Sequence, residues 1–506
     1  MFCDTATEDF FRARLDHMLD LRQPLPVLAS RMPWQQIEAS VAHVFSRKAR
    51  TLTPMPDLDL FGETIAPVAS KSNAGRPRVP LRIMIALLYL KHAFNESDEG
   101  VVARWAETPS WQYFSGRAYF EQRQPCDATT LVKFRQLLGE DGAEALLAQT
   151  INIAVGLDLI KPEQLQRVIV DSTVQHKAIA HPTDSRLLET ARAKLVEAAK
   201  SAGLSLKQTF AKEGTELGRK AGRYAHARQF RRMRRVIKRQ RTIVARVQRE
   251  IARKAAHITG TLKAVLDQAQ SKASRIVLQS TSKKALQGQP KLYSWHAPEV
   301  SCINKGKSRQ PYEFGVKVGI ASTLEHNLVV GAKAFHGNPF DGHTLTEQIK
   351  QAAKLMKATK ARPRSVYVDL GYRGVDKANP AVGIWHRGKF KQMTQYEKTM
   401  LKRRQAIEPI IGHLKQDCRM GRCHLKGVLG DKLHAVLCAA GYNIRWLLRA
   451  IAQQGLDFLR SLFLRLKWVA TAASHMLEGT LRRFVGGFNV PICQVGQNPF
   501  ALLGWI

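Results

Sequence analysis

Two short apolar runs in this chain each end in an aspartate: Val168-Ile169-Val170-Asp171 and Val366-Tyr367-Val368-Asp369. Short runs rich in β-branched and aromatic residues predict buried strands. In an open α/β sheet, ligands bind at the carboxyl ends of the strands. An aspartate after a strand is also ordinary turn chemistry, but two of them on adjacent strands can hold a divalent metal ion between them. The runs therefore indicate an α/β fold with a metal-binding edge.

The remaining patterns place these two strands in a larger mixed fold. Further strands are predicted at residues 312–322 and 326–335, a helix at 343–357, and helix from about residue 394 onward. Before residue 160 the pattern is helical, with segments near 80–90, 99–108 and 127–138. We expect N-terminal helices and a linker over 1–75, a helical domain over 76–160, an α/β core over 161–450 and a tail over 451–506. The second of these has helix-turn-helix character, although a helical bundle with no DNA role is the alternative.

Charge limits the partners of the chain. Its 506 residues carry 79 Lys or Arg against 41 Asp or Glu, a formal net charge of +38. This excess argues against an ordinary enzyme of small neutral substrates and favours a polyanion, nucleic acid first and an acidic membrane surface second.

The charge is concentrated in a helical segment expected over 184–290. Within it, residues 219–254 contain 15 Lys or Arg and a single acid, Glu250. A plain solvated helix surface is possible, but such a run repels itself without a counter-anion. We expect contact with the DNA backbone from Arg231, Arg232, Arg234, Arg235, Lys238 and Arg239.

Other features predict a cytoplasmic protein. The first twelve residues contain three acids and lack the basic start and apolar run of a signal peptide. Seven scattered cysteines fit a reducing compartment better than a disulfide framework. The apolar stretches 433–448 and 456–477 are interrupted by cations, so we expect no membrane span.

A third acid, Glu408, lies in a helical pattern with Arg404 and Lys415 on the same expected face. Pro409 is expected to kink this helix. Cleavage or joining of a phosphodiester is well served by two hard cations held by carboxylates. Asp171, Asp369 and Glu408 could supply them from two strands and one helix, although an exposed ion-pair stripe would produce the same spacing around Glu408.

The chain resembles the bacterial insertion-sequence transposases of the DDE class, specifically insertion-sequence family five. The similarity covers about residues 8–450 and includes an entry to the N-terminal helical domain at Gly75-Arg76-Pro77. The motifs that carry it, in the order of the family, are Val170–Gln175, His296–Val300, Pro311–Lys317, Gly337–Leu345, Asp369–Gly374 and Glu408–Lys415.

The resemblance implies an RNase H-like mixed-sheet core with a long basic helical insertion after its first strand. It implies that Asp171, Asp369 and Glu408 bind two Mg²⁺ ions, for which Mn²⁺ can substitute. It also implies double-stranded DNA partners, namely terminal inverted repeats and a target, and a homodimer assembled on DNA in the bacterial nucleoid. The residues expected to contact DNA, besides the basic segment, are Arg76, Arg78, Arg373, Arg404 and Lys415. The family has Tyr where this chain has Leu401, which puts one end contact in doubt.

Two other functions stay open. The chain could be a DNA-binding relic that represses its own element without catalysis, or a DNA nuclease on the same RNase H-like fold.

Several residues in or near the motifs have less distinctive expectations. Asp341 is expected to cap the helix that follows it, and Tyr372 to contact DNA or lie in a solvated turn. A zinc site is disfavoured because there is no CxxC pair and the stretch is basic; the residues that would form it are Cys418, Cys423, His413 and His424.

Overall fold

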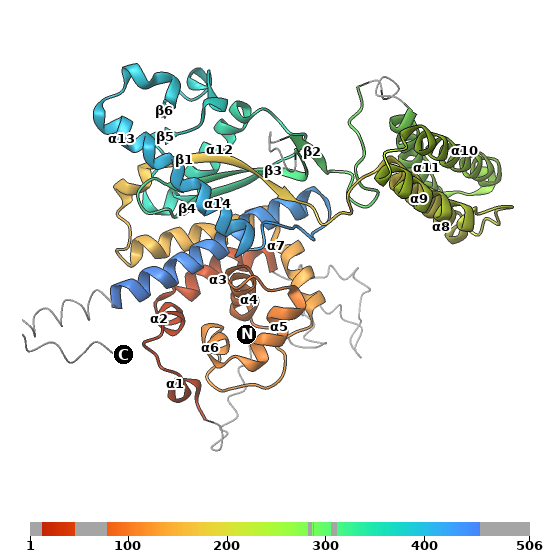
Figure 1. The fold of residues 1–506 in the computed structure, drawn as a ribbon. Helices are drawn as coiled ribbons and strands as arrows, with labels where there is room; N and C mark the ends of the chain where they lie inside the picture. The colour runs from red at the N-terminus through yellow and green to blue at the C-terminus, as the bar shows by residue number, and fades with distance from the viewer. Residues whose placement is uncertain (1–12, 46–77, 282–285, 287, 305–310, 456–506) are drawn as a thin grey trace, which may run out of the picture. The chain divides into compact units, whose positions relative to one another are not determined.

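The computed structural model describes residues 13–45, 78–281, 286, 288–304 and 311–455 (Figure 1). The chain forms two compact units, Met1–Leu448 and Arg449–Ile506. All elements described below belong to the first unit, except for the end of one helix. Arg76 and most of the predicted tail lie outside the described residues.

The first part of the chain is helical, as predicted. Its α-helices are α1 (Leu15–Met18), α2 (Pro24–Arg31), α3 (Trp34–Ala42), α4 (Leu81–Ala93), α5 (Asp98–Glu107), α6 (Pro109–Phe114) and α7 (Ala128–Gly156). A 3₁₀ turn, η1 (His43–Phe45), follows α3. Helix α4 is buried along nearly its whole length, which explains why its sequence is apolar on all sides rather than on one stripe.

Helix α7 is longer than predicted. Asp127 caps it as expected, because its carboxylate accepts a hydrogen bond from the Thr129 amide at 2.8 Å. The chain kinks at Gly139 (φ 66°, ψ −176°) and then continues helically to Gly156. Only glycine adopts this backbone conformation easily, so the predicted end near residue 138 is a kink and not a terminus.

The sheet has six strands: β1 (Arg167–His176), β2 (Ser301–Asn304), β3 (Tyr312–Thr323), β4 (Val329–Phe335), β5 (Ser365–Tyr367) and β6 (Gly383–Trp385). The order is β2-β3-β1-β5-β6, and β4 also pairs with β3. Strand β1 is antiparallel to β3 and parallel to β5, and β6 is parallel to β5. The sheet is therefore mixed. The four predicted strands are confirmed, whereas β2 and β6 are additional strands that the sequence did not predict.

Helices cover the sheet and join it to the N-terminal helices. Helix α12 (Asp341–Leu355) packs against β3 and β4, α14 (Ile407–Gln416) packs against β1, and α7 packs against α12. Gln351 of α12 donates a hydrogen bond to Glu144 of α7 at 2.6 Å. A further helix over residues 427–455, called here the 427–455 helix, carries Asn443. The Asn443 side chain bonds both the amide and the carbonyl of Val329, at 3.0 and 2.8 Å.

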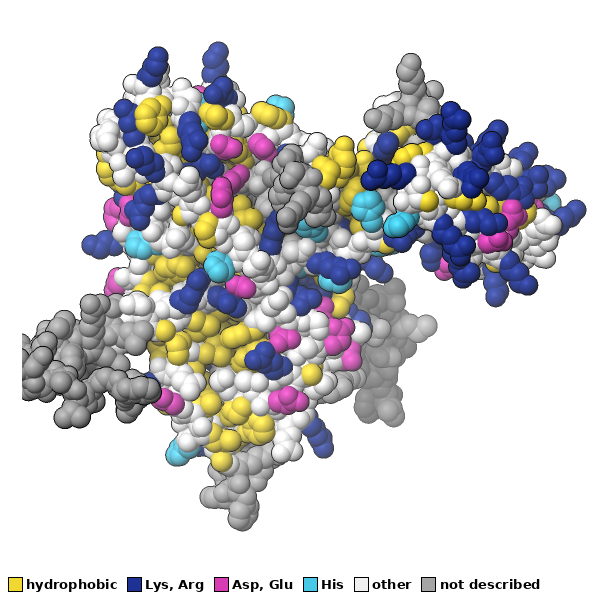
Figure 2. Space-filling view, viewed as in Figure 1, with side chains coloured by type: hydrophobic (Ala, Val, Ile, Leu, Met, Phe, Trp, Pro, Cys, Tyr) yellow, Lys and Arg dark blue, Asp and Glu magenta, His cyan; other side chains and the backbone are white. Residues whose placement is uncertain are grey.

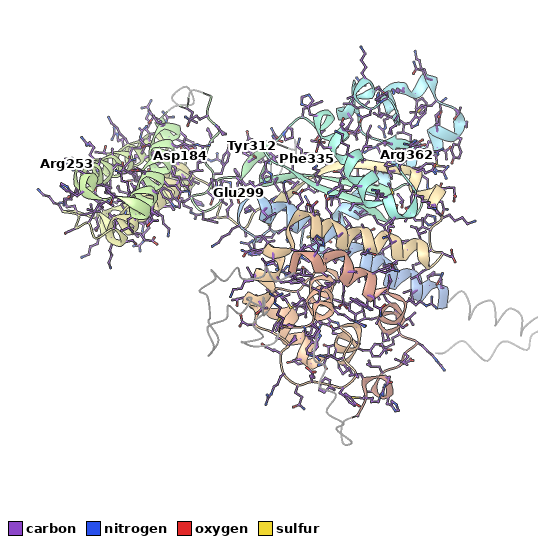
Figure 3. The ribbon with its side chains drawn as sticks, turned by 180° about the vertical axis from the view of Figure 1, so that it is seen from behind. Asp184, Arg253, Glu299, Tyr312, Phe335 and Arg362 are labelled. Carbon is purple, nitrogen blue, oxygen red and sulfur yellow. The ribbon has the colours of Figure 1, made fainter. Side chains whose placement is uncertain are left out.

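Buried charges anchor the far end of β1. Lys177, the residue after β1, forms ion pairs with Glu299 and with Asp431, both at 2.8 Å. Glu299 is labelled in Figure 3. In the same view, Tyr312 marks the start of β3 and Phe335 marks the end of β4. Burial alone would lower the pKa of Lys177, but hydrogen bonds to Asp431 and Glu299 outweigh it and raise that pKa. The lysine therefore stays charged and ties β1 to the 427–455 helix.

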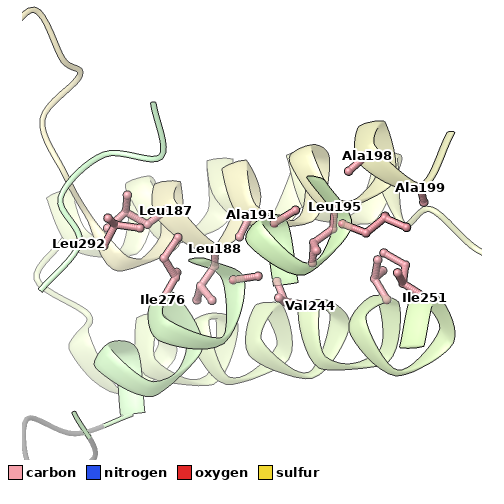
Figure 4. Packing of buried hydrophobic residues seen from close by; sticks show 14 of the residues in the cluster. Leu187, Leu188, Ala191, Leu195, Ala198, Ala199, Val244, Ile251, Ile276 and Leu292 are labelled. Carbon is pink, nitrogen blue, oxygen red and sulfur yellow. The ribbon is translucent and has the colours of Figure 1, made fainter. Parts of the chain in front are cut away.

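Four helices, called here the helical bundle, lie between β1 and β2 in the chain. They are α8 (Asp184–Ser201), α9 (Ala211–His226), α10 (Phe230–Lys254) and α11 (Gly260–Thr281), with η3 (Ala255–His257) after α10. The apolar faces of α8, α10 and α11 form one core, which includes Leu188, Leu195, Val244 and Ile276 (Figure 4). In α10 the buried positions recur as on one helix face, so the cations of this helix are directed away from the core.

Short elements complete the region after β4. They are η5 (Lys357–Thr359), η6 (Leu370–Tyr372), η7 (Asp376–Ala378), η8 (Arg387–Gln392), α13 (Gln395–Arg403) and η9 (Arg404–Ala406). Among the described residues, none of the helices combines the length and the apolar character needed to cross a bilayer.

Candidate active site

Asp171 lies in the middle of β1 and not at its end. The predicted strand stops at Asp171, but β1 continues to His176 because residues 172–176 pair with β3 along their whole length. On the other side of β1, pairing with β5 ends at Ile169 and Tyr367. Beyond that pair, no strand among the described residues pairs with this edge of β1, and Asp171 lies on this part of β1.

Asp369 follows β5 as predicted. It lies two residues beyond Tyr367, just as Asp171 lies two residues beyond Ile169. Since side chains alternate along a strand, the two aspartates continue the same register and project from the same face of the sheet. The Asp369 side chain is 56% exposed and that of Asp171 is 25% exposed.

One guanidinium lies between the two carboxylates. Arg404 Nη1 is 3.7 Å from Asp171 Oδ2, and Arg404 Nη2 is 3.8 Å from Asp369 Oδ1. The Arg404 side chain is mostly buried, with 13% exposed. At these distances Arg404 forms ion pairs with the two carboxylates rather than hydrogen bonds. The two carboxylates therefore converge on a single positive charge.

Glu408 lies on a helix that packs against the strand of Asp171. It lies in the first turn of α14, the helix that packs on β1 through the buried residues Ile407, Ile410 and Leu414. Its side chain is exposed. Within the described part of the chain, one set of three His, Cys, Asp or Glu side chains lies close enough to share a metal ion, and it does not include Glu408. The structure brings Asp171 and Asp369 together but does not close a triad around them.

The helical run around Glu408 is interrupted one turn before Pro409, and not at the proline itself. Helix α14 begins at Ile407, so Pro409 is in its first turn, where a missing N–H costs no helical hydrogen bond. The irregularity comes earlier, in the 3₁₀ segment η9 at Arg404–Ala406. Arg404 thus precedes α14, and half-buried Lys415 lies in the last turn of the same helix.

Asp341 does not cap a helix, contrary to expectation. The N-cap of α12 is Phe340, which makes no side-chain capping bond. Instead, Asp341 Oδ1 accepts hydrogen bonds from Ser172 Oγ at 2.9 Å and from Lys317 Nζ at 3.0 Å. Lys317 also donates to the Pro339 carbonyl at 2.6 Å. The Asp-Gly pattern before a helix predicts a capping aspartate. In the structure the Asp341 carboxylate bonds Ser172 of β1 and Lys317 of β3 instead of the helix amides.

This network lies directly beside the two aspartates. Ser172 adjoins Asp171, and its amide donates to Asp171 Oδ1 at 2.7 Å. The backbone of Gly371, two residues after Asp369, is close to the Asp341 carboxylate, since a Cβ at that glycine would be 3.6 Å from Asp341 Oδ2. Sequence reasoning missed the role of Lys317, although Lys317 and Asp341 both lie in motifs quoted above.

Tyr372 is buried, so the expected DNA contact or solvated turn is wrong for this residue. Burial raises the pKa of its phenol, which therefore stays neutral. The hydroxyl makes no hydrogen bond of normal geometry, although Ser172 and Thr344 lie beside it. Arg373, the next residue, is exposed and lies near His386.

A cationic pocket of about 540 Å³ adjoins Arg404. Its lining residues are Arg387, Phe390, Lys398, Leu401, Lys402, Arg404 and Gln405. Lys398 Nζ lies 4.9 Å from the centre of the Phe390 ring. Leu401, which stands in the family's Tyr position, forms part of the apolar wall and is 6% exposed. Four cations around one hollow favour an anion such as a phosphodiester.

The cations of the helical bundle fall into two groups. Arg231, Arg232, Arg234, Arg235 and Lys238 are exposed and make no ion pair with any described residue. Arg239 differs, because its guanidinium pairs with the Glu213 carboxylate at 2.6 Å. Lys and Arg side chains gather over the bundle surface (Figure 2), and Figure 3 labels Asp184 and Arg253 there. In the N-terminal helices, Arg78 is exposed and donates to the Phe45 carbonyl at 2.6 Å.

Comparison with known proteins identifies the class. Residues 48–137 match the family described as "Transposase domain (DUF772)", and residues 271–444 match "Transposase DDE domain". A relative from Rhizobium meliloti, described as "Uncharacterized protein ORF8 in nfe locus", is 40% identical over 222 residues, which cover 44% of this chain and 95% of the relative. No solved structure matches the chain.

The chain belongs to the DDE transposases of insertion sequences. It is accordingly a DNA transposase, a class that binds DNA and generally uses divalent metal ions. The DDE match includes Asp369 and Glu408 and begins after Asp171.

Proposed function

We propose that this transposase cleaves phosphodiesters at the ends of its element and joins them to a target, with Asp171, Asp369 and Glu408 as its metal-binding carboxylates. The observation that carries the proposal is the convergence of Asp171 and Asp369 on Arg404, at 3.7 and 3.8 Å. Two carboxylates from different strands that face one cation form a site suited to positive charge. In insertion-sequence family five, the more specific class proposed here, this geometry belongs to an RNase H-like core.

The donor chemistry fits Mg²⁺. Carboxylate oxygens are the ligands that Mg²⁺ takes from proteins, and the Arg404 guanidinium stands in for a cation between the two aspartates. Glu408 is exposed on the helix that packs on β1. Its side chain can therefore change rotamer without losing buried contacts. Two bound Mg²⁺ ions, or Mn²⁺ in their place, would activate the attacking oxygen and stabilise the leaving oxygen.

The remaining side chains hold DNA. Arg404, which faces the two aspartates, would bind the phosphates of the element end together with Lys415 and Arg373. The cationic pocket next to Arg404 would hold a neighbouring phosphate. Water attacks the phosphodiester and frees a 3′-hydroxyl, which then attacks a target strand in the same site. Ser172, Asp341 and Lys317 would keep the Asp171 carboxylate oriented during both steps, because each is tied to the next by a hydrogen bond.

Binding of DNA outside the site would be shared between two regions. The N-terminal helices, with Arg76 and Arg78, would recognise the terminal inverted repeats through their helix-turn-helix-like part. The exposed cations of α10 would hold flanking or target DNA without sequence preference. Two ends must be joined at once, so a homodimer on DNA within the bacterial nucleoid is part of the proposal.

One experiment separates this function from its rivals. The purified protein is incubated with labelled element ends, target plasmid and Mg²⁺. The proposal predicts cleavage at the repeat boundary and strand transfer. Binding without cleavage would favour a repressor relic, and cleavage without dependence on the repeats and without joining would favour a nuclease.

A further inference from the structure

A second cluster of ligand-type side chains lies away from the carboxylates. His92 from the last turn of α4 meets His434 and Cys438 from the 427–455 helix. One ligand atom from each residue lies within 4.8 Å of the others. All three side chains are buried, with residue exposures of 1%, 4% and 0%. His434 and Cys438 are four residues apart, so they share one helix face.

Each of the two imidazoles has a ring nitrogen that can bind a metal ion. His434 Nε2 bonds the Arg419 carbonyl at 2.9 Å, which leaves Nδ1 for another partner. A histidine that donates one ring N–H to a backbone carbonyl is the usual arrangement around a metal ligand. His92 Nδ1 lies 3.5 Å from Cys438 Sγ. Its Nε2 atom is buried and makes no hydrogen bond of normal geometry, although the Cys418 backbone lies beside the ring.

Cys418 can supply a fourth donor. Its side chain is fully buried and its backbone lies beside the His92 ring. The Cys418 thiol is outside the set of donor atoms that lie within 4.8 Å of one another, so it would have to change rotamer to complete the site. A tetrahedral zinc site with two nitrogens at ~2.0–2.1 Å and two sulfurs at ~2.3 Å needs donor atoms about 3.5 Å apart. The His92–Cys438 separation of 3.5 Å already meets this requirement.

We propose that His92, His434, Cys438 and Cys418 form a structural zinc site that fastens the N-terminal helices to the 427–455 helix. Nitrogen and sulfur donors select Zn²⁺ over the oxygen-seeking Mg²⁺ of the carboxylate site. The site is closed to solvent and has no open position for substrate, so its role is structural.

Nearby charge is compatible with this site. Lys91 and Arg135 lie near both histidines and Arg419 lies near His434, so an added dication alone would be repelled. Zinc with two thiolates and two neutral imidazoles has no net charge, so the surrounding cations oppose it little.

The test is metal content of the full-length chain, purified from zinc-supplemented cells in the Asp171→Asn/Asp369→Asn background to exclude binding at the carboxylates. The proposal predicts one zinc per chain by mass spectrometry of the metal. It also predicts, after replacement by Co²⁺, a thiolate-to-cobalt charge-transfer band in the near ultraviolet. Absence of both stoichiometric zinc and this band would overturn the proposal.

Variants assign the ligands. Cys438→Ser and His434→Asn are expected to lower zinc content at least tenfold, whereas Cys302→Ser and His413→Asn, outside the cluster, should retain it. Stoichiometric zinc in Cys438→Ser would contradict the site. If the variants do not fold, the cobalt band of the parent chain and the fall of its melting temperature in a chelator decide the question. Neither measurement depends on transposase activity.

Discussion

Asp171 and Asp369, nearly 200 residues apart in the sequence, face the two terminal nitrogens of the single Arg404 guanidinium. That relationship makes Arg404 more than a nearby positive charge. A planar guanidinium can face two carboxylates at once, whereas a lysine ammonium is a single point charge.

Arg404→Lys is therefore expected to reduce cleavage of element ends by about tenfold or more, equivalent to ~1.4 kcal/mol of transition-state stabilisation. The measurement is single-turnover cleavage at saturating protein. Arg403→Lys is the matched control, because Arg403 is the preceding residue and is exposed. Equal rates for the two variants would show that the bridging geometry has no part in the reaction.

The Asp341 network predicts a change in metal dependence. Loss of the partners that orient a metal-binding carboxylate typically costs 10–100-fold in metal affinity or activity. Asp341→Asn and Lys317→Met should each raise the Mg²⁺ concentration needed for half-maximal cleavage by about that range. Lys333→Met provides the control, since its partner Glu347 lies on the exposed side of α12. If both Asp341→Asn and Lys317→Met keep the parental Mg²⁺ requirement, the network contributes to folding and not to metal binding.

The bundle surface predicts a change in the salt dependence of DNA binding. Replacement of Arg231, Arg232, Arg234 and Arg235 by Gln removes exposed cations, and each lost phosphate contact lowers the slope of log K against log salt by ~0.9. Non-specific binding should weaken with a slope reduced by up to about 3–4. Arg239→Gln should change the slope less, because Glu213 already neutralises Arg239. If the fourfold variant keeps the parental slope of log K against log salt, the phosphate contacts are made by residues other than these four arginines.

Buried charge in the N-terminal helices predicts a pH-dependent stability. Asp98 pairs with Lys91 at 2.6 Å and with Arg135 at 2.9 Å. Burial alone would raise the pKa of Asp98, but the Arg135 hydrogen bonds and the Lys91 charge hold that pKa at about 2. Since this folded-state pKa is below the ordinary value of 3.8, the stabilisation is complete above about pH 5 and is lost as the pH falls toward 2.

Asp98→Asn should lower the free energy of unfolding by about 3 kcal/mol at neutral pH, because it leaves two buried cations without their anion. Urea titrations of both proteins between pH 7 and 3 should show this difference constant above about pH 5 and shrinking below 4. Asp141→Asn, at an exposed ion pair, should cost little. A difference independent of pH would argue against the ionised carboxylate as its cause.

The sequence predicted the elements of the fold better than their contacts. The β-branched runs before Asp171 and Asp369 identify strands because local composition determines strand propensity. The continuation of β1 past Asp171 could not be predicted, because its polar residues are held by pairing with β3, more than 100 residues away in the chain. The misassignment of Asp341 has the same origin, since a local capping pattern was overridden by Ser172 and Lys317.

The buried cluster at His92 shows the same limit. His434 and Cys438 share a helix face and could be found from spacing alone. His92 is over 300 residues earlier in the sequence, and only the packing of α4 against the 427–455 helix brings it there.

The Asp369→Asn variant, measured for both binding and cleavage of labelled element ends in Mg²⁺, tests the proposed carboxylate site. We expect end binding within about threefold of the parent chain and cleavage reduced by at least a thousandfold, equivalent to ~4 kcal/mol of transition-state stabilisation. Mg²⁺-dependent cleavage retained at the parental rate would contradict the assignment of Asp369, and with it the proposed site.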